Sequence, residues 1–309
     1  MKILFTLTLL AFSFMSIAQK SFSGRAIESS KAWIDLDYVG DGIIGHKLDI
    51  FLPNEGKGPF PVIVTIYGSA WFSNSSKGNC FQDGFGQRLL AAGYAVVSIN
   101  HRSSKDALWP AQIHDVKAAI RFIRANAADF SLDTNFIGIT GFSSGGHLSA
   151  MAGVSSRIKT YSKDGLSIDL EGSVGKFTDA ESHVDAVVNW YGPTDFLIMD
   201  TCGSEFSHDA PESPESSLIG GPIQENKEKV MLANPLTYAS NDNPPMLIFH
   251  GDKDPLVPLC ESQKLYEKQM ETGASSQLVI VPGGGHGPGV MIPEYFEQMV
   301  AFFDKLRSK

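Results

Sequence analysis

Short apolar segments alternate with segments of helical periodicity along this chain. Buried strands are predicted by runs rich in β-branched residues at 47–52, 61–67 (PVIVTIY), 94–100, 136–139, 184–191, 246–250 and 277–281. Helices are predicted between and after them, at 82–92, 109–126, 147–154, 259–271 and 293–306. This alternation predicts an α/β fold with a mostly parallel central sheet and helices on both faces.

The segment 194–236 interrupts the alternation. It mixes Pro, Gly, Ser and Glu and has no long periodic stretch, so we expect an insertion lying over the sheet. No interdomain linker, internal repeat or heptad run is present. With 309 residues of which 43% are hydrophobic, the chain fits one large domain from residue 19 to 309.

The first 18 residues have the composition of a signal peptide. Lys2 precedes an almost entirely apolar stretch, and Ser16-Ile17-Ala18 has the small-x-small form of a cleavage site. The alternative is an uncleaved membrane anchor, although the apolar stretch is short for a membrane span. We therefore expect an exported protein, periplasmic or secreted, without a stable membrane anchor.

The net charge and the cysteine content limit the classes of partner and cofactor that we expect for this chain. The net charge of −9 argues against nucleic acid and anionic membranes as partners. The three cysteines lack metal-ligand spacing, and we expect no cofactor and no catalytic metal. In an exported protein two cysteines can pair, and our hypothesis is a Cys202–Cys260 bridge that ties the insertion to the core.

The segment 141–147 (GFSSGGH) carries the strongest chemical signal. It has the G-x-S-x-G form and lies between a predicted strand and a predicted helix. In that context the central serine occupies a sharp turn that projects its hydroxyl from the edge of a sheet, so Ser143 is the candidate nucleophile. The motif alone is modest evidence, because Gly/Ser loops are common.

A serine nucleophile needs a base and an orienting carboxylate, which follow it along the chain in this kind of fold. His286 lies in a glycine-rich loop directly after the last long strand and is the candidate base. Asp252 and Asp254 both follow the strand at 246–250. We assign the acid to Asp254, before Pro255, and expect Asp252 to cap the turn through an Asx-type bond.

The chain also offers donors for a developing oxyanion. The N–H of Ser144 follows the nucleophile directly, and further donors are expected from 67–71 (YGSAW), the loop after the PVIVTIY strand.

Several segments together resemble the α/β-hydrolases of the carboxylesterase type, from about residue 31 to 309. The similarity is carried by 67–71, 100–103 (NHRS), 109–115 (WPAQIHD), 141–147, 217–235 and 250–258. Within that group the chain resembles bacterial exported esterases related to feruloyl and acetylxylan esterases.

The resemblance assigns further roles. It implies that Ser69 and Ala70 donate to the oxyanion together with Ser144, and that Trp71 lines the substrate pocket, with a core position as the alternative. Tyr67, Ser69 and Ala70 depart from the family's His-Gly-Gly-Gly-Trp pattern, which puts the geometry of the oxyanion hole in question. Arg102 and Asp115 are expected to form a structural ion pair, with substrate contact as the alternative.

The function predicted is therefore a serine esterase acting on acetyl or feruloyl esters of plant cell-wall polysaccharide such as xylan. An amide hydrolase, either an exopeptidase or an arylformamidase-like enzyme, is the alternative, since the same triad cleaves both bonds. A non-catalytic binding protein that retained the fold is a third reading, motivated by the departures at 67–70.

Overall fold

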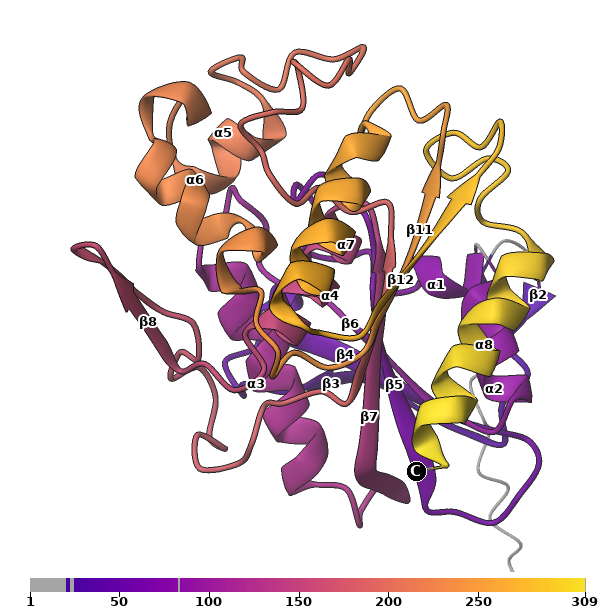
Figure 1. Cartoon of the computed structure of the whole chain (residues 1–309). Coiled ribbons are helices and arrows are strands. Elements are labelled where there is room, and N and C mark those ends of the chain that lie inside the picture. Colours follow the sequence, from indigo (N-terminus) through magenta and orange to yellow (C-terminus); the bar gives the residue numbers. More distant parts are fainter. Residues whose placement is uncertain (1–20, 23–24, 83, 309) are drawn as a thin grey trace, which may run out of the picture.

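A computed structural model describes residues 21–22, 25–82 and 84–308. The predicted signal peptide and its cleavage site lie outside these residues. A mixed sheet forms the centre of the described chain, with helices on both of its faces (Figure 1). The predicted α/β fold is confirmed.

The eight strands of this sheet follow an order that crosses the sequence. In space they run β12 (Ser276–Val281), β11 (Met246–Gly251), β10 (Ala186–Trp190), β7 (Leu132–Phe142), β5 (Phe60–Ile66), β6 (Ala95–Ile99), β4 (Lys47–Leu52) and β3 (Lys31–Asp37). The strands from β12 to β6 are parallel, and β4 and β3 extend one edge by antiparallel pairing. The carboxyl ends of β7, β11 and β12 consequently lie along one edge, where the candidate site forms.

Helices cover the two faces separately. One face carries α3 (Ala111–Ala125), α4 (Ser144–Val154) and α7 (Leu259–Thr272). The other carries α1 (Asn79–Gln82), α2 (Phe85–Ala91) and α8 (Pro293–Arg307).

Alternating side chains of the strands build two cores. Along β4, Leu48, Ile50 and Leu52 belong to the core under α3 and α4, whereas Phe51 belongs to the core under α2 and α8. Because successive strand side chains point to opposite faces, one buried strand supplies both cores, and this explains why the strand sequences are almost continuously apolar.

The insertion is built of short elements. It contains α5 (Pro214–Ile219), η2 (Ile223–Glu225), α6 (Lys227–Ala233) and the start of η3 (Pro235–Tyr238). In Figure 1 α5 and α6 lie beyond the helices of the α3 and α4 face, outside the sheet. The remaining elements are η1 (Ile44–His46) and two small hairpins, β1–β2 (Ser21–Phe22 and Arg25–Ala26) and β8–β9 (Thr160–Lys163 and Leu166–Asp169).

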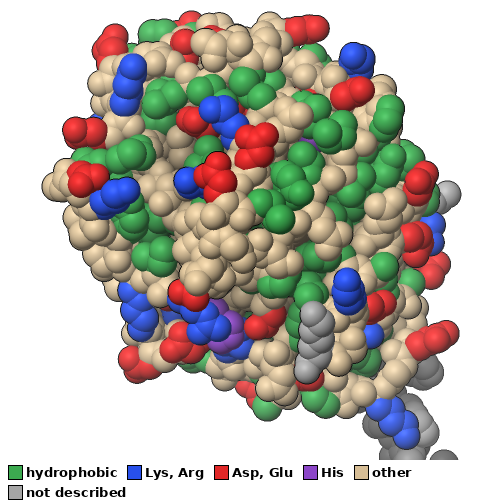
Figure 2. Space-filling model, viewed as in Figure 1, with side chains coloured by type: hydrophobic (Ala, Val, Ile, Leu, Met, Phe, Trp, Pro, Cys, Tyr) green, Lys and Arg blue, Asp and Glu red, His purple; other side chains and the backbone are tan. Residues whose placement is uncertain are grey.

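The surface drawn in Figure 2 shows acidic and basic side chains interspersed, with apolar side chains between them. None of the helices in the described part of the chain combines the length and the apolar character that crossing a membrane requires.

Candidate active site

Ser143 occupies the sharp turn between β7 and α4. Its φ of 56° and ψ of −125° are unusual for a residue with a side chain. A Cβ on Gly141 or Gly145 would collide with backbone atoms of Gly145 and Ile66, respectively. The chain can therefore make this turn only because both positions are glycine, and the turn leaves Ser143 half-buried and open to the pocket.

His286 connects Ser143 to Asp254. His286 Nδ1 lies 2.7 Å from Asp254 Oδ2, and its Nε2 lies 2.9 Å from Ser143 Oγ. A carboxylate only accepts hydrogen bonds, so Nδ1–H donates to Asp254 and Nε2 is left to accept from the Ser143 hydroxyl. The structure thus brings together the three residues singled out from the sequence, in the order that lets a serine lose its proton to an imidazole.

The Asp254 side chain is fully buried and firmly oriented. Its Oδ1 accepts the N–H groups of Leu256 at 2.9 Å and Val257 at 3.0 Å, which leaves Oδ2 for His286. These two bonds orient the carboxylate before any substrate arrives.

Asp252 has a different role from the one expected. Instead of bonding within its own turn, its Oδ1 accepts the N–H of Gly283 at 2.7 Å. Gly283 belongs to the loop that carries His286. Asp252 therefore links this loop to the loop that carries Asp254.

Backbone donors lie beside Ser143. Ala70 and Ser144 line the same pocket as Ser143, and neither amide has an acceptor among the described residues. The Ser69 amide instead donates to Ser144 Oγ at 2.9 Å. The expectation that Ser69 donates to the oxyanion does not fit this arrangement, because its N–H already serves a side chain that the sequence did not connect to it.

Gly68 lets this donor loop approach the nucleophile. A Cβ at Gly68 would lie 2.8 Å from the Cβ of Ser143 and 2.7 Å from the carbonyl of Phe142. Of the three glycines in the family's His-Gly-Gly-Gly-Trp pattern this chain retains Gly68, and packing against Ser143 and Phe142 requires a glycine at that position.

A pocket of about 310 Å³ opens at Ser143 and His286. Its size is that of a small-molecule site. Trp71 lines it and is only 1% exposed, with its ring edge-to-face against His147 and Phe196, so this tryptophan belongs to both the pocket and the core. The far wall comes from the insertion and consists of Phe206, Ser207, His208, Pro214 and Glu215.

The insertion is fixed to the loop that carries Asp254. The predicted Cys202–Cys260 disulfide is present, with the two Cα atoms 6.4 Å apart. The Glu205 N–H donates to Pro255 O at 2.9 Å, and Ser204 Oγ donates to Leu256 O at 3.0 Å. The insertion therefore forms a fixed wall of the site, and the third cysteine, Cys80, is buried away from this disulfide.

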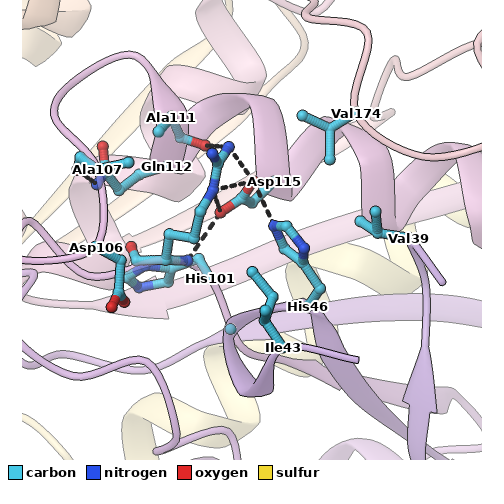
Figure 3. Close-up of polar contacts among 12 residues, drawn as sticks. Val39, Ile43, His46, His101, Asp106, Ala107, Ala111, Gln112, Asp115 and Val174 are labelled. Carbon is cyan, nitrogen blue, oxygen red and sulfur yellow. Dashed lines mark hydrogen bonds and ion pairs between the residues drawn. The ribbon is translucent and has the colours of Figure 1, made fainter. Parts of the chain in front are cut away.

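Arg102 and Asp115 form the expected ion pair beneath the site. Arg102 donates to both oxygens of Asp115, at 2.9 Å through Nε and 2.7 Å through Nη2. His46 also faces Asp115, at 3.1 Å, and Figure 3 shows the two side chains pointing toward each other. The Arg102 guanidinium is thus occupied by Asp115 and the Ala111 carbonyl, which favours a structural role over substrate contact.

This charged cluster is consistent with the pKa directions of its members. Burial opposes the charge on Asp115, but hydrogen bonds from His46 and Arg102 outweigh it and lower the pKa of the Asp115 carboxyl. Burial also disfavours the charged form of His46, yet bonds to Asp115 and Asp41 raise its pKa. The cluster joins η1 and the loop at 100–103 to α3.

Comparisons with known proteins agree with this geometry. Residues 48–269 match the model of the BD-FAE family, which is more than half of the chain. The chain is 47% identical to the truncated form of a carbohydrate esterase from gut microbiota, with a TM-score of 0.87 over 91% of this chain and 98% of that one. It is 48% identical to a bifunctional GH43-CE protein of Bacteroides eggerthii, with a TM-score of 0.84 over 89% of this chain and 38% of that one.

Among curated proteins, the esterase LipQ of Mycobacterium tuberculosis is 30% identical over 217 residues, which are 70% of this chain and 47% of that protein. The chain spans about half the length of LipQ and of two further curated relatives that it matches.

Proposed function

Because the chain belongs to the BD-FAE family and is an α/β-hydrolase of the carboxylesterase type, we propose that it hydrolyses carboxylic esters through an acyl-enzyme on Ser143. The observation that carries the proposal is the pair of contacts that link His286 to Ser143 and Asp254. Ser143, His286 and Asp254 are the nucleophile, base and orienting acid in this proposal.

The reaction follows from the positions of these groups. Ser143 Oγ attacks the acyl carbon while His286 Nε2 takes the hydroxyl proton, and Asp254 stabilises the imidazolium. The carbonyl oxygen becomes an oxyanion, and in this proposal the amides of Ala70 and Ser144 donate hydrogen bonds to it. His286 then gives its proton to the leaving alcohol, and a water molecule activated by the same imidazole releases the acid.

The finer proposal concerns the substrate, for which we propose acetyl or feruloyl esters of a plant cell-wall polysaccharide such as xylan. The similarity to a carbohydrate esterase supports it, as does a pocket of about 310 Å³, which admits the ester end of a longer polymer. Amide hydrolysis by the same triad has less support, because the relatives compared above are named as esterases.

We also propose that the protein works outside the cytoplasm. The Cys202–Cys260 disulfide supports this proposal, since such bonds persist in oxidising compartments.

The first test is hydrolysis by the wild type and by Ser143→Ala. The panel contains acetylated xylan, methyl ferulate, short p-nitrophenyl esters and an aminoacyl anilide. We expect release of acetate or ferulate by the wild type and a loss of about 10⁴-fold or more in kcat for the variant.

Three results would revise the proposal. Retained activity in Ser143→Ala would overturn the assignment of the nucleophile. Cleavage of the anilide alone would favour the amide hydrolase. Turnover of only the p-nitrophenyl esters would leave a carboxylesterase of another substrate class.

A further inference from the structure

Glu215 lines the pocket that contains Ser143. Its side chain is only 4% exposed, and it lies in the first turn of α5 on the wall formed by the insertion. Oε2 lies 3.0 Å from His208 Nδ1. Oε1 accepts no hydrogen bond from the described residues. It does not belong to the fully buried polar atoms without a partner, so part of its surface is accessible to solvent. A residue that lines the pocket therefore keeps one accepting atom without a donor among the described residues.

The contacts of His208 favour an ion pair with Glu215. His208 Nε2 lies 2.9 Å from the carbonyl oxygen of Leu256, which only accepts, so Nε2 carries a proton. His208 Nδ1 faces a carboxylate, which in its ionised form also only accepts. With a carboxylate at Glu215, Nδ1 donates as well. Burial disfavours the charged form of His208, but the bonds to Glu215 outweigh this effect and raise the pKa of His208.

The ion pair holds Glu215 in position. His208 is bonded at both ring nitrogens, one to the insertion and one to the loop of Asp254, and it is 7% exposed. Glu215 Oε1 is thereby presented at a set place rather than on a flexible surface side chain.

The surroundings of Glu215 suggest what it binds. Pro193, Pro214, Leu256 and Val257 make this part of the wall largely apolar, and Phe206, 55% exposed, adds an aromatic face at the rim. A carboxylate oxygen in an apolar wall favours a ligand that brings a hydrogen-bond donor and disfavours one that cannot. A neutral ester with a hydroxyl group meets this requirement.

We propose that Glu215 selects substrates that carry a hydroxyl group near the scissile ester, by accepting a hydrogen bond from that hydroxyl through Oε1. This inference rests on the proposed ester hydrolysis at Ser143. The hydroxyl belongs either to a sugar ring on the alcohol side or to the phenol of a feruloyl group on the acyl side. Both sources offer the same chemistry, and the experiment separates them.

The test measures kcat/KM on matched substrates that differ in one hydroxyl. For the sugar, a methyl xyloside monoacetate is compared with its fully acetylated form, which has no free hydroxyl. For the phenol, methyl ferulate is compared with methyl 3,4-dimethoxycinnamate. A short p-nitrophenyl ester, which has no hydroxyl, serves as the reference.

The variant is Glu215→Gln, which preserves the volume and the bond to His208, since the amide can donate to Nδ1 of the neutral ring. We expect kcat/KM on the hydroxyl-bearing member of one pair to fall by about 10-fold, because a charged acceptor is replaced by a neutral one. The capped member and the p-nitrophenyl ester change little. Glu212→Gln, on an exposed residue of the same segment, is the matched control and leaves all substrates unchanged.

Each outcome decides the inference. A selective loss in the sugar pair or in the phenol pair supports it and identifies the source of the hydroxyl. An equal loss on every substrate, including the p-nitrophenyl ester, would mean that Glu215 only supports the pocket wall. No loss on any substrate would mean that Oε1 contacts no substrate. Either result would overturn the inference. Failure of the wild type on all esters instead overturns the proposed function, which separates the two failures.

Discussion

Three residues around the candidate site have backbone conformations that normally favour glycine. Ser143, Ala70 and Trp71 have φ angles of 56°, 50° and 57°. Each costs about 1–2 kcal/mol for a residue with a Cβ. At Ser143 the conformation aims the hydroxyl at His286, and at Ala70 and Trp71 it shapes the donor loop beside the nucleophile.

Ala70→Gly tests this cost directly. Glycine adopts a positive φ without the steric penalty but loses more entropy on folding, so the net gain in the free energy of unfolding is expected to be about 0.5–1 kcal/mol. The amide donor is retained, and kcat is expected to stay within about threefold of the wild type, an order-of-magnitude allowance for an unaltered oxyanion contact. Urea unfolding and p-nitrophenyl ester hydrolysis measure the two effects. A loss of stability would show that contacts of the Ala70 methyl group outweigh the strain.

At the scale of single residues, local sequence signals predicted most of the candidate active site. Ser143 is marked by its flanking glycines, and His286 by its place after the last long strand. The engagement of the Ser69 amide was not predictable, because it depends on Ser144, 75 positions away. Glu215 and His208 were missed as well, since a pair seven residues apart in an aperiodic segment leaves no pattern.

At the scale of elements, the insertion matters because of how it is attached. Its first residues bond to α7 through Glu261, which accepts the N–H groups of Thr194 and Asp195, each at 2.6 Å. The disulfide joins the same turn of α7 to Cys202. Two neighbouring residues of one helix therefore fix the part of the insertion that leads into the pocket wall.

Removing the disulfide should destabilise the protein. The bond closes a loop with a sequence separation of 58 residues, for which a loss of about 2–4 kcal/mol in the free energy of unfolding is typical. Cys202→Ser measured by urea unfolding should show this loss. A reductant should produce a similar loss in the wild type and no further loss in the variant; an additional effect on the variant would point to a target other than this disulfide.

The sequence predicted the buried elements better than the exposed ones. The strand expected at 136–139 extends over Leu132–Phe142. The helix expected at 82–92 is α2, over Phe85–Ala91, and the short helix α1 precedes it. The β8–β9 hairpin was missed because each of its strands has only four residues, most of them exposed, which bury little apolar surface. The short helices of the insertion are set by caps such as Ser213, which accepts the Ser216 N–H, rather than by periodicity.

For the whole molecule, Glu261 links stability to pH. Its complete burial raises the pKa of the carboxyl from 4.5 to about 8, against the hydrogen bonds that it accepts. The folded protein therefore holds this proton more tightly than the unfolded chain does. The resulting stabilisation is complete below about pH 4.5 and is lost as the pH rises through about 8.

Glu261→Gln isolates this contribution. His46 and His208 also have raised pKa values and act in the same direction, so the comparison between the wild type and the variant is what matters. We expect the free energy of unfolding of the wild type to fall more steeply between pH 5 and pH 8.5 than that of the variant, as measured by urea unfolding at several pH values. Parallel pH profiles for the two proteins would refute the shifted titration of Glu261.

The attachment of the insertion has a consequence for the evolution of specificity. The chain leaves the sheet after β10, is bound to α7 at Glu261 and Cys260, and returns to the sheet at β11, while Ser143 and His286 lie on loops outside this stretch. The intervening stretch could be exchanged between relatives as a cassette, provided that these anchors, the contacts to Pro255 and Leu256, and the buried apolar residues that join the core, such as Phe196, Leu218 and Ile223, are retained. Grafting it from a relative with a different acyl or alcohol preference would then transfer the preference while leaving the reaction chemistry in place.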